Sequence, residues 1–181
     1  MKTNIVMVLT GLAILFLVNI SIWQNQLHLS EGEVIYLELA PVDPRSLMQG
    51  DYMALRFAMS NKIYTAFSEQ KALQQENLQH NIWKIDMLVV NHGYVVVEKD
   101  VNQVAQFVRL ENNQPITKFQ RKLQFRMRDD RVKFASNAFF FEEGDEPLYR
   151  DARYGVFRVN KKGEVLLTGM LDEQYNLLGR H

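Results

Sequence analysis

An uncharged N-terminal run constrains this chain more than any other feature. Residues 5–23 ("IVMVLTGLAILFLVNISIW") contain no charged side chain, and only Thr10, Asn19 and Ser21 are notably polar. About 20 helical residues, each rising roughly 1.5 Å, cross the hydrocarbon core of a bilayer. The run therefore predicts one transmembrane helix at residues 5–23, preceded by a short tail at residues 1–4.

A cleaved signal peptide is the main alternative, because it also combines a basic start with an apolar stretch. Its apolar region is shorter, about 7–15 residues, and ends at a site of the small-x-small type. Here the run ends in "NISIW", without Ala-x-Ala, and Trp23 lies where an interfacial aromatic is expected. The sequence favours an uncleaved anchor over a signal peptide, and both over a buried core helix.

Charge around the run predicts its orientation. Lys2 and the terminal amine precede it, and the next Lys or Arg is Arg45. The positive-inside rule then places the tail in the cytoplasm. We expect a single-pass membrane protein, with residues 24–32 as a short polar tether and residues 33–181 as a domain across the membrane from the tail. In a Gram-negative cell the helix would lie in the inner membrane and the domain in the periplasm.

Composition excludes several classes of site. The chain has no cysteine, which rules out disulfides, thiolate metal sites and a cysteine nucleophile. Lys plus Arg equals Asp plus Glu, 21 of each, so no nucleic-acid partner is expected. The four histidines lack metal-ligand spacing, and the acidic residues 142–146 lack the pattern of a calcium loop. No metal or other cofactor is predicted.

Period-two patterns dominate the rest of the chain. A helical period occurs over residues 61–79, entered through Asn61 or Ser68, and His92-Gly93 has the composition of a hairpin turn. These patterns predict an α+β fold that is mainly antiparallel β, a sheet or open barrel with one main helix. The expected strands are residues 33–40, 52–59, 82–91, 94–100, 101–110, 118–128, 131–135, 154–159 and 164–170.

Two blocks carry a resemblance to a known family. "GDYMALRF", residues 50–57, resembles the signature of the GDYXXLXY family of membrane-anchored bacterial proteins, and "DPR" at residues 43–45 resembles the turn before it. A second block at residues 139–169 is similar to the C-terminal half of the family. Phe57 stands where the family name has tyrosine. The resemblance implies an extracytoplasmic domain without an established enzymatic activity, often encoded beside polytopic membrane proteins.

The signature supplies the first candidate residues. After Gly50, an Asp51 carboxylate accepts backbone N–H bonds in a turn, which is a structural role, or it contacts a ligand or partner. Tyr52 points away from the alternating apolar residues and suits an interface. Charged and aromatic residues recur in "YRDARYG", where Arg153, and with it Arg158, has the chemistry to bind a carboxylate such as Asp51. The predicted binding set is Asp51, Tyr52, Arg56, Tyr149, Arg153 and Tyr154.

The basic residues 118–133 suggest a second contact surface. Alternation places Lys122, Arg126 and Arg128 on one strand face. The opposite face is apolar apart from Arg121. The basic face is either simply solvated or contacts anionic lipid headgroups or an acidic partner.

Three functions remain open at this stage. The favoured one is a non-enzymatic binding or accessory subunit for a polytopic membrane protein. An envelope hydrolase is an alternative, since Ser46 in "SLMQGDYM" faintly resembles membrane-anchored signal peptidases, with Lys84 as the candidate base. A small-ligand or lipid-binding module is the third.

Overall fold

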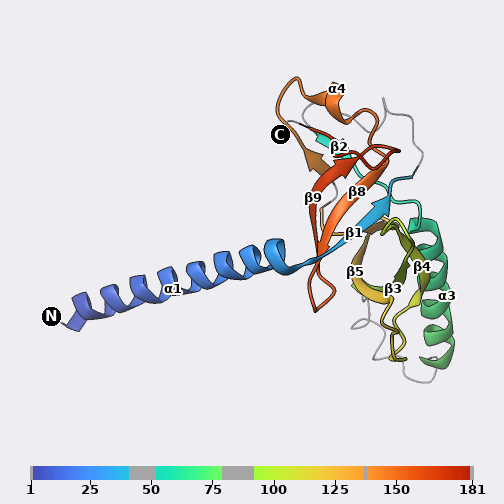
Figure 1. Ribbon diagram of the computed structural model, residues 1–181. Helices are drawn as coiled ribbons and strands as arrows, with labels where there is room; N and C mark the ends of the chain where they lie inside the picture. Colours follow the sequence, from blue (N-terminus) through green and yellow to red (C-terminus); the bar gives the residue numbers. More distant parts are fainter. Residues whose placement is uncertain (1, 41–51, 79–91, 137, 180–181) are drawn as a thin grey trace. The chain divides into compact units, whose positions relative to one another are not determined.

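The computed structural model describes residues 2–40, 52–78, 92–136 and 138–179 (Figure 1). The chain divides into two compact units, Met1–Gly32 and Glu33–His181. The first unit is helix α1 (Lys2–Glu31). The second contains β1 (Glu33–Glu38), β2 (Tyr52–Ala54), α3 (Ser60–Leu78), β3 (His92–Lys99), β4 (Ala105–Leu110), β5 (Gln120–Arg128), β6 (Arg131–Lys133), β7 (Ala138–Phe140), α4 (Glu146–Tyr149), β8 (Tyr154–Val159) and β9 (Val165–Leu171).

Helix α1 is long and apolar enough over Leu9–Glu31 to cross a membrane, properties that a signal sequence also has. Its polar side chains bond within the helix. The Thr10 hydroxyl donates to the Val6 carbonyl at 2.9 Å, and the Asn19 amide to that of Leu15 at 2.8 Å, as an apolar environment requires. The helix continues through residues 24–31, where the sequence predicts a tether, and ends before Gly32.

The described residues of the second unit form three antiparallel sheets. Their strand orders are β1-β8-β9, β2-β7 and β4-β3-β5-β6, and the four-stranded sheet curves into a half-barrel beside α3 (Figure 1). The predicted class, mainly antiparallel β with one main helix, is confirmed. The core follows from alternation, since Ile35 and Leu37 of β1 and Phe157 of β8 are buried. Helix α3 covers the half-barrel, with Phe67 packed edge-on against Phe125 at 5.7 Å.

The predicted helix at residues 61–79 is confirmed as α3, and it starts at Ser60, so an entry at Ser68 is wrong. The strand predicted over residues 52–59 ends at Ala54, although Phe57 still forms an isolated bridge with Leu39. The Leu39–Phe57 bridge keeps this segment beside β1 while the chain turns into α3. The predicted strand at residues 82–91 and the corner at residues 41–51 lie outside the described residues.

Two local predictions are wrong for physical reasons. His92 and Gly93 belong to β3 and pair with Arg126 and Phe125 of β5. Gly93 faces the Phe125 ring, where an added Cβ would lie 3.0 Å from the ring, so this glycine serves packing and not a turn. Residues 101–103 lie within the predicted strand 101–110 but form a turn, and Val104 makes an isolated bridge with Tyr36. The Asp100 carboxylate, which accepts N–H bonds from Asn102 and Val104, holds the turn.

Candidate functional site

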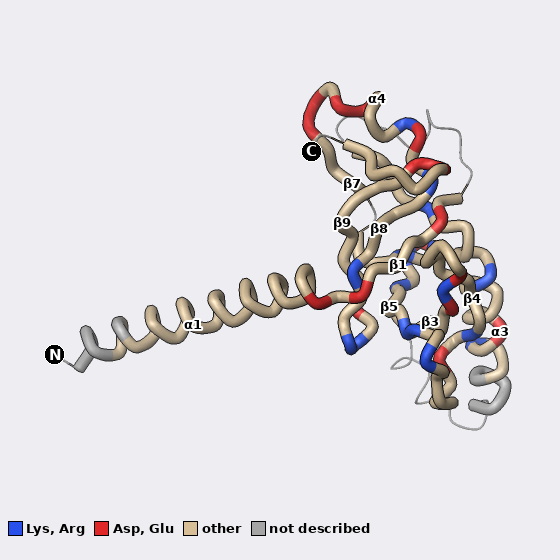
Figure 2. The backbone as a smooth tube through the Cα atoms, in the orientation of Figure 1, with Lys and Arg blue, Asp and Glu red and all other residues tan. Residues whose placement is uncertain are grey.

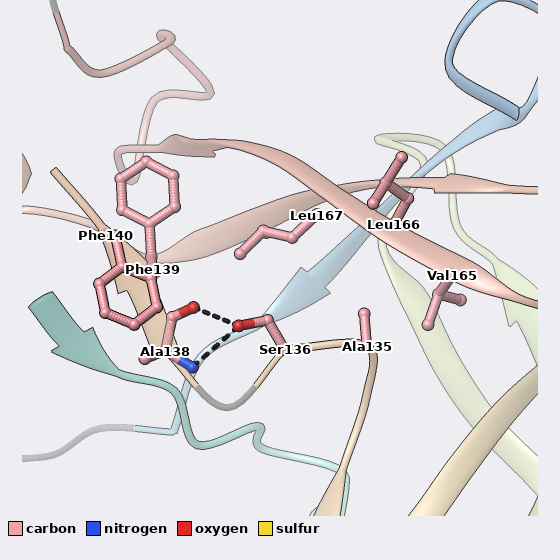
Figure 3. Close-up of a pocket in the computed structure, with 8 residues that line it drawn as sticks. All are labelled: Ala135, Ser136, Ala138, Phe139, Phe140, Val165, Leu166 and Leu167. Carbon is pink, nitrogen blue, oxygen red and sulfur yellow. Dashed lines mark hydrogen bonds between the residues drawn. The ribbon is translucent and has the colours of Figure 1, made fainter. Parts of the chain in front are cut away.

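An apolar pocket of about 470 Å³ lies between strands of two different sheets (Figure 3). One wall is β7 and the other is β9, and Ala135 and Ser136 line one end. The lining residues are Ala135, Ser136, Ala138, Phe139, Phe140, Val165, Leu166 and Leu167.

The pocket is bounded by strand edges. Successive side chains of a strand point to opposite faces, so a cavity over one face contacts every second residue. Here three consecutive residues of each strand line the cavity, residues 138–140 of β7 and 165–167 of β9. The cavity therefore lies beside both strands, in the gap where two sheets fail to join.

The Ser136 side chain stabilises the β7 wall. Its hydroxyl accepts the N–H of Ala138 at 3.2 Å and donates to the Ala138 carbonyl. Both main-chain groups of Ala138 thus bond to a neighbouring side chain. A serine hydroxyl can donate one hydrogen bond and accept another. An alanine at residue 136 would remove both bonds to Ala138.

Aromatic rings surround the pocket. Phe140 is 72% exposed, and its ring lies 5.8 Å from that of Tyr52. Tyr149 of α4 packs against Phe139 at 4.9 Å and Phe141 at 5.4 Å. Two predicted binding residues, Tyr52 and Tyr149, therefore contact rings of this phenylalanine run, in which Phe139 and Phe140 line the cavity. Aromatic residues in this setting are common where proteins meet partners.

A cationic rim, formed by Arg126 and Lys133, lies near the Ala135 end of the pocket. The Arg126 guanidinium donates from Nη2 to the Ala135 carbonyl at 2.8 Å. Arg126 is directly opposite Lys133 in the β5–β6 pair, so both side chains leave the same sheet face. This predicted contact residue therefore holds the pocket wall and adds positive charge next to it.

The other two predicted basic residues have partners nearby. Lys122 forms an ion pair with Glu111 at 3.2 Å and lies over the Tyr94 ring at 5.2 Å. Arg128 is 3.9 Å from the Asp129 carboxylate, and both are exposed. Acidic and basic segments alternate around this sheet (Figure 2), so much of its charge is balanced locally.

The remaining predicted residues lie outside the pocket. Arg56 and Arg153 are exposed, and their described bonds are main-chain ones: the Arg56 carbonyl accepts from Ala40, and that of Arg153 from Leu39. Asp51 lies outside the described residues. The proposed Asp51–Arg153 ion pair therefore stays a prediction.

Tyr154 belongs to a stack of three tyrosines. Tyr175 lies between Tyr154, at 4.9 Å, and Tyr36, at 6.2 Å. Its hydroxyl donates to the Tyr154 hydroxyl at 3.5 Å, and this bond, with burial, raises the pKa of Tyr154 to about 12. The phenol stays neutral near pH 7, and the stack fastens the C-terminal segment to the β1-β8-β9 sheet. Sequence reasoning missed Tyr36 and Tyr175 as partners of Tyr154.

An ion-pair cluster lies where the chain enters the second unit. Glu33, the first residue of β1, accepts hydrogen bonds from Lys99 of β3 and Arg121 of β5. Burial alone would raise the pKa of Glu33, but its hydrogen bonds and ion pairs with Arg121 and Lys99 outweigh burial and lower the pKa below 4.5. Arg121, which intrudes on the apolar face of its strand, thereby joins two sheets.

We expect the contribution of Glu33 to stability to depend on pH. Because its folded-state pKa is lowered, the contribution is complete above the unfolded pKa and is lost as pH falls through the folded pKa. Glu33→Gln should lower the melting temperature near pH 7, with a free-energy loss below about 1 kcal/mol per pair because the groups are partly exposed. Thermal unfolding of the full-length protein in detergent measures it.

The control for this prediction is Glu143→Gln, since Glu143 is an exposed loop residue. It should leave the melting temperature unchanged near pH 7. The Glu33→Gln difference should shrink as the pH falls from 7 through the lowered folded pKa of Glu33, because the wild-type carboxylate is then itself protonated. A difference that does not change with falling pH would contradict the ion-pair explanation.

The described residues were also searched for a metal site and for the residues of the hydrolase alternative. Among them, no group of three or more His, Asp or Glu side chains is placed to hold a metal ion. Ser46 and Lys84, the residues of the hydrolase alternative, both lie outside the described part of the chain. What the described pocket offers is apolar surface with a cationic rim.

Sequence reasoning did not identify the pocket residues, although one signal was present. Three consecutive phenylalanines, residues 139–141, cannot all face one side of a strand. At least one must therefore leave the core face, and Phe140 is the one that does so. Leu166, Leu167 and Ser136 carried no comparable signal.

Comparison with known proteins gives one match. A family model described as "GDYXXLXY protein" matches residues 14–170 of the chain. No curated protein and no solved structure matches the chain significantly.

Proposed function

Since the chain belongs to the GDYXXLXY family, we propose that it is a binding subunit for a polytopic membrane protein. Helix α1 is then an uncleaved anchor in the inner membrane, and the second unit works in the periplasm. An anchor raises the local concentration of the domain for a partner in the same membrane.

The exposed apolar pocket is the observation that supports this proposal. Exposed apolar surface with aromatic rings is typical of protein interfaces, which concentrate their binding energy in a few such rings. Phe140 projects from the pocket wall with 72% of its surface exposed. A partner that covers this ring would remove apolar surface from water, which favours association.

A small-molecule role is less well supported. The cavity volume falls in the range of about 300–1,000 Å³ that small-molecule sites occupy. Such sites also need polar groups to orient their ligand. Ser136 is the one polar side chain among the lining residues, and its hydroxyl already bonds to both main-chain groups of Ala138.

Site-specific photocrosslinking tests the proposed function. A benzophenone amino acid replaces Phe140 in the full-length protein in cells, and the crosslinked proteins are identified by mass spectrometry. We expect one polytopic membrane protein to dominate, because the side chain at residue 140 is exposed at the pocket.

The matched control places the same probe at Val101, which is 97% exposed in the turn before β4. That position should give little of the same product. Equal yields at both positions, or products that contain only soluble proteins, would contradict the proposal.

A further inference from the structure

Among the described residues, the outer edge of β9 is partly unpaired beside the pocket. β9 pairs with β8 on one side. On its other side, the C-terminal segment covers one end, through a bridge between Leu171 and Leu177 and a bond from Leu178 N–H to the Met170 carbonyl. Within the described residues, no strand pairs with residues 165–168 along that edge. Unpaired strand edges of this kind accept a further strand.

The opposite wall of the pocket, β7, differs from β9 in what it offers a partner. β7 pairs with β2 on one side, and its Ala138 main-chain groups bond to the Ser136 hydroxyl. One wall of the pocket therefore offers main-chain donors and acceptors, and the other offers phenylalanine rings. An extended polypeptide satisfies both, because its main chain pairs with β9 while alternate side chains enter the cavity.

The positive charge of the rim favours extended segments that carry an acidic residue. Arg126 and Lys133 lie side by side at the Ala135 end. Glu164, the residue before β9, accepts a bond from the Asn160 amide at 2.6 Å, and among the described residues no ion pair links it to either cation. A segment with an acidic end is therefore complementary to this rim.

We propose that the β9 edge binds an extended apolar segment of the partner protein, with an acidic residue at the Arg126–Lys133 end. The segment fills the gap between β9 and β7 as an added strand. This inference rests on the proposed function and names the part of the partner that the subunit recognises. An acyl chain would fill the same apolar volume but would need neither main-chain pairing nor the rim.

The probe is a fluorescent peptide of about ten residues, two glutamates followed by alternating leucine and threonine. Its matched control carries N-methyl groups on alternate amides, which removes the donors of one edge and keeps the side chains. Full-length protein in nanodiscs is titrated with each peptide by fluorescence anisotropy. We expect saturable binding of the first peptide and at least about ten-fold weaker binding of the N-methylated one, because each lost main-chain bond weakens pairing.

Variants test the rim separately. Arg126→Glu should weaken binding about two- to five-fold, the range for an exposed charge pair. A peptide with lysines in place of the glutamates should regain that loss on the variant. Lys133→Glu provides a second variant, in which the bond from Arg126 to Ala135 is retained. Circular dichroism confirms that each variant is folded.

The outcomes separate the two proposals. Equal binding of the N-methylated peptide would overturn strand pairing and point to apolar filling, as by an acyl chain. Absence of peptide binding would also overturn it, even if residue 140 crosslinks to a polytopic protein and the proposed function stands. Peptide binding that needs free amides, without any polytopic crosslink in cells, would support the β9 site and reject the membrane partner.

Discussion

Replacing Phe57 with alanine is expected to lower the free energy of unfolding by about 3–5 kcal/mol, the range for truncating a buried phenylalanine. Phe57 is 3% exposed. Its ring contacts Phe134 at 5.3 Å and Phe157 at 5.8 Å, both edge-on. It thus joins the segment before α3, the end of the half-barrel and β8, so the cavity left by alanine would lie where three parts of the fold meet.

Urea unfolding of the full-length protein in detergent, followed by the circular dichroism of the strands, measures this loss. Phe119→Ala is the control, because it removes the same ring from a position that is 61% exposed. That variant should change stability by no more than about 0.5 kcal/mol. Similar losses at both positions would show that Phe57 is not a central packing residue.

Replacing Gly163 with alanine is expected to cost about 2–4 kcal/mol. Gly163 has a φ of +84°, a conformation that costs an L residue roughly 1–2 kcal/mol. An added Cβ would also lie 2.7 Å from the Lys122 carbonyl oxygen. Relief of this clash moves the β8–β9 turn away from β5 and breaks the 2.7 Å bond from Gln124 N–H to the Gly163 carbonyl.

Gly144→Ala separates the two causes. Gly144 has nearly the same φ, +88°, but no atom within 4 Å of an added Cβ. Its replacement should therefore cost only the conformational part, about 1–2 kcal/mol. The same unfolding experiment compares the two variants. If both lose equal stability, the contact between the turn and β5 contributes nothing.

The described residues of the family signature pack in two different places. Tyr52 packs beside Phe140 near the pocket, whereas Leu55 and Phe57 pack with the hydrophobic core. The described part of "GDYMALRF", residues 52–57, therefore packs largely with the core, and its aromatic last residue fills space there by its size and shape. A tyrosine hydroxyl is not needed for the ring contacts that Phe57 makes with Phe134 and Phe157.

Local pattern predicted the strands well where one face is buried. The alternation of β5 correctly assigned Leu123 and Phe125 to the core and Arg126 to the opposite face. Local pattern wrongly placed Gly93 in a turn. A glycine is needed there because the Phe125 ring of a neighbouring strand leaves no room for a side chain. Glycine at a turn and glycine under an aromatic ring look the same in one sequence.

The sequence by itself determined the features that depend on neighbours along the chain: the apolar helix, the strand periods and the helix predicted at residues 61–79. Only the tertiary structure decided that β7 and β9 stop short of pairing, and that Arg126 lies at the end of the gap between them. The physical reason is the sequence separation of the residues whose contacts decide each feature. Periodicity reports which face of an element is buried, whereas an open edge depends on how separate sheets pack, which is set by contacts between residues distant in sequence.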